Sequence, residues 1–68
     1  MRKPPIEPGD RFVKIEDRRT VWVVDRVVET VGRLPHVQLV QEARPHRRRT
    51  LSESILRDRN FYARLGPV

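Results

Sequence analysis

The longest run of β-branched and aromatic side chains lies between Thr20 and Thr30 and includes Trp22. Side chains of this kind are enriched in β-strands, so this segment predicts the central strand of the fold. Its alternation of apolar and polar positions is interrupted at Asp25, and Val27 restores an apolar position three residues after Val24. One extra residue near Asp25 would account for this shift, so we predict a β-bulge that bends the strand.

Other segments alternate between apolar and polar positions with the two-residue period of a strand. They cover residues 11–15, 36–41 and 60–65, and residues 47–50 form a weaker candidate because no apolar side chain follows until Leu51. In the last strand, Tyr62 is expected to face outward together with Arg64. The side chains expected to face inward are Phe12, Trp22, Val37, Leu39, Phe61, Ala63 and Leu65.

Residues 52–56 carry the one helical signal in the chain. Ser52 is of a type that caps a first helical turn, and the negative charge of Glu53 suits the positive end of a helix. Leu51 and Leu56 have the spacing of a hydrophobic staple around that cap. We therefore predict one or two turns, α-helical or 3₁₀, before the last strand.

Together these elements predict a mainly β fold, a small five-stranded barrel with one short helical or 3₁₀ turn before the last strand. The element order resembles an SH3-like (Tudor-like) barrel, and in particular short stand-alone bacterial proteins without an assigned function. The resemblance covers residues 8–65, and barrels of this shape bind nucleic acids, proline-rich peptides, methylated side chains or other proteins. It is carried by Pro8-Gly9-Asp10-Arg11-Phe12, Val21-Trp22-Val23-Val24, His36-Val37-Gln38-Leu39, Arg49-Thr50-Leu51-Ser52 and Phe61-Tyr62.

The length of 68 residues predicts a single domain, which we place at residues 10–65. Pro4, Pro5 and Pro8 argue against a helix or an interior strand, so residues 1–9 are expected to form a flexible lead-in. Residues 66–68 are expected to be a short tail. The chain has no Cys, no secretory signal and no apolar run near the ~20 residues of a membrane span, which predicts a soluble cytoplasmic protein.

The charge balance favours a polyanionic partner, because the chain has 15 Lys and Arg residues and 9 Asp and Glu residues, which gives a formal charge of +6. The densest basic segment is residues 44–49, where four Arg and His46 fall within six positions. We hypothesise that these guanidinium groups bind nucleic-acid phosphates and that Tyr62 stacks on a base. The predicted contact residues are Arg33, Arg44, Arg47, Arg48, Arg49 and Tyr62.

Two other interpretations of the same residues remain open. In the first, the arginines of residues 44–49 stay hydrated on an edge strand, where their charge blocks edge-to-edge aggregation. Alternatively, the protein is an interaction module that docks on an acidic protein partner or associates with itself. The apolar residues that alternation leaves on the second face of the sheet would supply the contact surface, namely Val13, Ile15, Val21 and Val23.

The sequence argues against catalysis and against a bound metal. His36 and His46 are the only histidines, and a zinc site needs three or four ligands. Ser52 and Ser54 suit helix caps better than nucleophiles, and the three glycines are too scattered for a phosphate-binding loop. A domain this thin is expected to lack a cleft of ~300 Å³ or more. We therefore expect no enzyme activity, no cofactor, no small-molecule substrate and no membrane partner.

Overall fold

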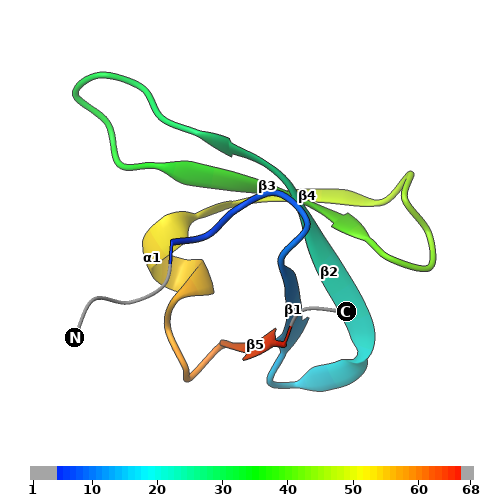
Figure 1. Cartoon of the computed structure of the whole chain (residues 1–68). Coiled ribbons are helices and arrows are strands. Elements are labelled where there is room, and N and C mark those ends of the chain that lie inside the picture. The colour runs from blue at the N-terminus through cyan, green and yellow to red at the C-terminus, as the bar shows by residue number, and fades with distance from the viewer. Residues whose placement is uncertain (1–4, 67–68) are drawn as a thin grey trace.

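The computed structural model describes residues 5–66, so the predictions for residues 1–4 and 67–68 lie outside the described residues. Five strands form one antiparallel sheet in the order β4-β3-β2-β1-β5, which confirms the mainly β fold (Figure 1). The elements are β1 (Arg11–Lys14), β2 (Asp17–Val28), β3 (His36–Gln41), β4 (Arg48–Ser52), α1 (Glu53–Leu56) and β5 (Tyr62–Leu65).

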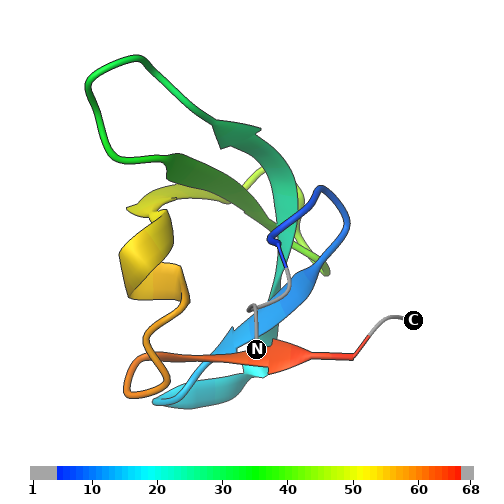
Figure 2. The same cartoon turned by 60° about the vertical axis from the view of Figure 1, so that its left-hand side comes forward.

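The sheet curls strongly but does not close by backbone pairing. β4 and β5 are its two edge strands, and within residues 5–66 no ladder joins them. Figure 2 shows the sheet curving around its concave side, where α1 lies. α1 follows β4 directly and packs against β4 and β3, and the chain then crosses to β5.

The predicted bulge is present in β2. The β2–β3 register shifts between Val24 and Arg26, so that Asp25 has no partner on β3. Because one residue is added there, Val24 and Val27 both face the core although they are three positions apart. The bend lets one long strand pair with β1 at one end and with β3 at the other.

The core lies on the concave face of the sheet. Trp22 is 5% exposed, and Val37 and Leu39 are fully buried, which confirms their predicted inward orientation. Ile6, which the sequence interpretation placed in the lead-in, is 7% exposed and belongs to the same cluster. The buried cluster consists of Ile6, Phe12, Trp22, Val24, Val37, Leu39, Leu56 and Tyr62.

The orientation predicted for the last strand is wrong. Tyr62 is 4% exposed and lies in the core, whereas Phe61 is 50% exposed. Tyr62 is the cross-strand partner of Lys14, which is two residues from Phe12 and therefore shares its face of the sheet. Both faces of this segment carry apolar side chains, so the register with β1, and not the sequence pattern, decides which face is buried.

The short helix is at the predicted place, but its first turn is held differently from the prediction. Ser52 is at the N-cap position, yet its side chain makes no capping hydrogen bond. The backbone N–H of Glu53 instead donates to the carbonyl oxygen of Pro35 at 3.0 Å. This bond anchors the start of α1 to the chain segment that leads into β3.

Candidate functional site

Arg44 and Arg47 lie together in the connection between β3 and β4. The backbone N–H of Arg47 donates to the carbonyl of Arg44 at 2.9 Å, and that of Gln41 donates to the carbonyl of Arg47 at 3.0 Å. These bonds close a tight turn at the end of the ladder. Both arginines line a surface hollow of about 440 Å³.

Arg19 lines the same hollow and was not among the residues predicted from the sequence. The pairing of β1 with β2 is irregular at this point, because Val13 pairs with Val21 and the next residue, Lys14, pairs with Asp17. Residues 18–20, which include Arg19, therefore have no partner in the β1–β2 register. At the other side of the hollow, the N–H of Glu42 donates to the carbonyl of Val21 at 2.9 Å. Only this cross-strand pairing reveals the proximity, because Arg19 and Arg44 are far apart in the sequence. We call Arg19, Arg44 and Arg47 the basic hollow.

The basic hollow carries three positive charges, and that of Arg19 also acts on the nearby carboxylate of Asp17, whose pKa it helps to lower. None of its three guanidinium groups forms an ion pair among residues 5–66. Glu42 also lines the hollow, but its carboxylate accepts hydrogen bonds from Arg11 Nε at 2.6 Å and Nη2 at 3.0 Å. The hollow therefore presents positive charge to solvent.

Asp17 is the nearby carboxylate whose titration the structure changes. The Thr20 hydroxyl donates to it at 2.8 Å and the N–H of Arg19 donates at 3.2 Å. These two hydrogen bonds hold the pKa of Asp17 below its usual value of 3.8, and the bond from Thr20 has the larger effect. Asp17 is thus ionised at neutral pH, and its bonds fix the local backbone that carries Arg19.

Arg48 and Arg49 point to different faces of β4 and take different roles. Arg48 Nη1 lies 3.6 Å from Asp25 Oδ2 in an exposed ion pair. Arg49 is half-buried, and its guanidinium lies 4.8 Å from the centroid of the Trp22 ring. Arg49 Nη1 also donates to the hydroxyl of Tyr62 at 3.3 Å. Arg49 therefore covers the core and does not line the basic hollow, and its role as a phosphate ligand stays a prediction.

Tyr62 and Arg33 also do not belong to the candidate site. Tyr62 is buried in the core, so the predicted stacking of its ring on a base is wrong. Arg33 follows Gly32 in the β2–β3 turn, where Gly32 has a φ of 79°. That turn and the β3–β4 turn lie at opposite ends of β3, about 20 Å apart for six residues (Figure 1).

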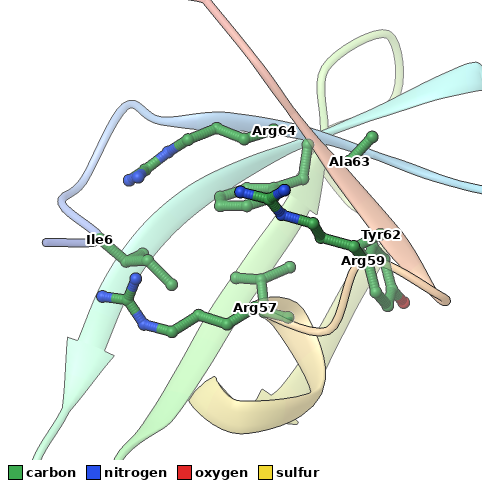
Figure 3. A pocket seen from close by; sticks show the side chains of 8 residues that line it. Ile6, Arg57, Arg59, Tyr62, Ala63 and Arg64 are labelled. Carbon is green, nitrogen blue, oxygen red and sulfur yellow. The ribbon is translucent and has the colours of Figure 1, made fainter. Parts of the chain in front are cut away.

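A second hollow of about 410 Å³ lies between the N-terminal segment, α1 and β5. Figure 3 shows the side chains of Arg57, Arg59 and Arg64 around it, and Ile6 and Tyr62 are among the apolar side chains that line it. The two hollows are larger than the sequence interpretation expected for so thin a domain. A hollow of this size is not by itself a reactive site. Within residues 5–66, no group of three His, Cys, Asp or Glu residues is placed to hold a metal ion.

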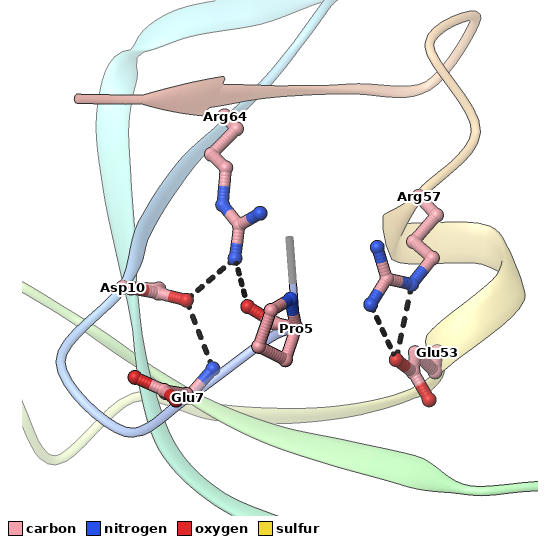
Figure 4. Close-up of polar contacts among 6 residues, drawn as sticks. All are labelled: Pro5, Glu7, Asp10, Glu53, Arg57 and Arg64. Carbon is pink, nitrogen blue, oxygen red and sulfur yellow. Dashed lines mark hydrogen bonds and ion pairs between the residues drawn. The ribbon is translucent and has the colours of Figure 1, made fainter. Parts of the chain in front are cut away.

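Two of these arginines hold the N-terminal segment and α1 in place (Figure 4). Arg64 Nη2 donates to Asp10 Oδ2 at 2.6 Å and to the carbonyl of Pro5 at 2.8 Å. Arg57 pairs with Glu53 one turn earlier, with its Nη2 at 2.9 Å from Glu53 Oε1. We therefore assign these two arginines a structural role.

Comparison with known protein families, with curated proteins and with solved structures returned no match to this chain. Among residues 5–66, no helix is both long and apolar enough to span a membrane.

Proposed function

We propose that this protein binds nucleic acid without sequence preference, through phosphate contacts made by the basic hollow. The observation that supports the proposal is the gathering of Arg19, Arg44 and Arg47 around one hollow, with no ion-pair partner in residues 5–66. The planar guanidinium group donates two parallel hydrogen bonds to a phosphate. A chain with a formal charge of +6 also attracts a polyanion over longer distances.

We further propose that the domain is an SH3-like barrel that is open between β4 and β5. The order of the strands in the sheet supports this assignment. Barrels of this type that bind proline-rich peptides or methylated side chains use exposed aromatic rings. Here Phe12, Trp22 and Tyr62 are buried, which favours a polyanion over these ligands. Phosphate contacts carry no sequence information, so we expect similar affinity for different sequences.

The salt dependence of binding tests this proposal. We would titrate fluorescent duplex DNA, single-stranded DNA and single-stranded RNA between low and moderate salt. Each phosphate contact on duplex DNA adds ~0.9 to the slope of log affinity against log salt. Arg47→Ala should therefore reduce this slope by about 0.9 and weaken binding to all sequences alike.

Arg33→Ala is the matched control, because it removes one positive charge from the opposite end of β3. It should leave the slope unchanged within error. The proposal is refuted if the wild-type protein binds none of the three probes at low salt. It is also refuted if the Arg33 and Arg47 variants lose affinity and slope equally, since net charge alone would then explain binding.

A further inference from the structure

The segment of β2 that carries Arg19 is an irregular part of the sheet. Its pairing with β1 passes from Val21 directly to Asp17, so residues 18–20 have no partner on β1. The pairing of β2 with β3 begins only at Trp22. The two ladders that hold the rest of β2 in place therefore do not fix the backbone at Arg19.

Hydrogen bonds to the side chain of Asp17 take the place of the missing ladder. Asp17 Oδ1 accepts the backbone N–H of Arg19 at 3.2 Å, and Oδ2 accepts the hydroxyl of Thr20 at 2.8 Å. Irregular segments of this kind turn side chains away from the direction that regular pairing would give them. Here the two residues bound by Asp17 are also the two that line the basic hollow from this side.

Asp17 has two opposing effects on the basic hollow. Its negative charge reduces the attraction of the hollow for phosphate, whereas its hydrogen bonds hold the backbone of Arg19. Both side chains are exposed, so water screens the charge between them. Among the causes of the lowered pKa of Asp17, the hydrogen bond from Thr20 is the largest and the charge of Arg19 is the smallest. The effect of Asp17 on the local backbone therefore outweighs its effect on the charge.

We propose that Asp17 is a positioning residue for phosphate binding, which holds the backbone of Arg19 so that its guanidinium group lies at the basic hollow before nucleic acid arrives. This inference rests on the proposed function, because it assigns a role within the same site. A residue whose backbone is already ordered loses less conformational entropy on binding. Charge alone predicts that removal of Asp17 increases the affinity, whereas the positioning role predicts a decrease.

The affinity for duplex DNA and its salt dependence test this role. Asp17→Ala should weaken binding about threefold to tenfold at each salt concentration, because binding must then order the backbone of Arg19. The slope of log affinity against log salt should stay close to the wild-type value, since Arg19 still makes its phosphate contact. Arg19→Ala should instead reduce this slope by about 0.9.

Glu16→Ala is the charge-matched control, because Glu16 is also an exposed carboxylate and forms no ion pair within residues 5–66. It changes the net charge as Asp17→Ala does, and it should leave the affinity unchanged or increase it. Asp17→Asn makes the same change in charge but keeps an oxygen that accepts the N–H of Arg19, so it should recover most of the lost affinity. Near-ultraviolet circular dichroism of Trp22 shows whether each variant is folded.

Two further measurements separate a role through Arg19 from a general effect on the domain. Hydrogen exchange at the N–H of Arg19 should be faster in Asp17→Ala than in the wild type, because the acceptor of that N–H is removed. In an Arg19→Ala background, Asp17→Ala should no longer weaken binding.

The positioning role is refuted if Asp17→Ala binds as tightly as Glu16→Ala. It is also refuted by unchanged exchange at the N–H of Arg19, or by an equal loss of affinity in the Arg19→Ala background. The proposed function survives these results if Arg47→Ala still reduces the salt slope. A wild-type protein that binds no duplex DNA, single-stranded DNA or single-stranded RNA at low salt refutes the proposed function and the positioning role together.

Discussion

Arg49 on β4 and Tyr62 on β5 connect the two edge strands of the sheet. Arg49 Nη1 donates to the Tyr62 hydroxyl at 3.3 Å while its guanidinium covers the ring of Trp22. β4 and β5 stand at opposite ends of the strand order, so this side-chain contact bridges the opening that backbone pairing leaves. An arginine that looks like part of a basic patch in the sequence therefore helps to hold the fold together.

The first prediction concerns this bridge. Arg49→Met keeps an apolar stem over Trp22 but removes the cation and the donor, and we expect it to lower the free energy of unfolding by about 1–2 kcal/mol. Tyr62→Phe removes only the acceptor. Chemical denaturation of the two single variants and the double variant should show a coupling of roughly 0.5 kcal/mol or more. Strict additivity would mean that the contact does not stabilise the sheet.

The second prediction concerns the centre of the core. Leu39 is fully buried on β3 between β2 and β4, so Leu39→Ala should cost about 2–5 kcal/mol in the free energy of unfolding. Leu34→Ala is the matched control, because Leu34 is 71% exposed, and it should change stability by less than about 0.5 kcal/mol. Similar losses in the two variants would contradict the assignment of the core. Thermal or urea denaturation measures both.

The third prediction concerns the N-terminal segment, which is part of the folded unit from Ile6 onward. Ile6→Ala removes a buried side chain at the edge of the core and should cost about 2 kcal/mol. Arg64→Ala removes the bonds to Asp10 and Pro5 and should speed hydrogen exchange at the N–H of Gly9, which donates to the carbonyl of Val24. Unchanged exchange at Gly9 would show that Arg64 does not hold this segment.

The fourth prediction concerns the acid side of the stability profile. The pKa of Asp17 is lower in the folded protein than its usual value of 3.8, so the ionised form stabilises the fold above that pH. This contribution is lost as the pH falls from 3.8 through the lower folded pKa. Asp17→Asn should therefore make the melting temperature less dependent on pH below about 4. Glu16→Gln, which removes the adjacent carboxylate, is the control and should keep the wild-type slope.

Much of the local structure followed from the sequence by itself. The position of β3, the bulge at Asp25 and the burial of Trp22, Val37 and Leu39 were all predicted correctly. These features depend on strand propensity and on the two-residue alternation of apolar and polar side chains. Both are properties of residues that are close together in the sequence. A strong period with one apolar face has only one way to bury that face.

The tertiary structure decided which side chains meet across strands. Tyr62 rather than Phe61 enters the core because the register with β1 places Tyr62 opposite Lys14. Arg49 turns toward Trp22, and Arg19 joins Arg44, through pairings between segments distant in sequence. Where both faces of a strand carry apolar or basic residues, the local pattern is compatible with either orientation. Only the packing of the whole sheet then selects one, because it alone determines which face is removed from water.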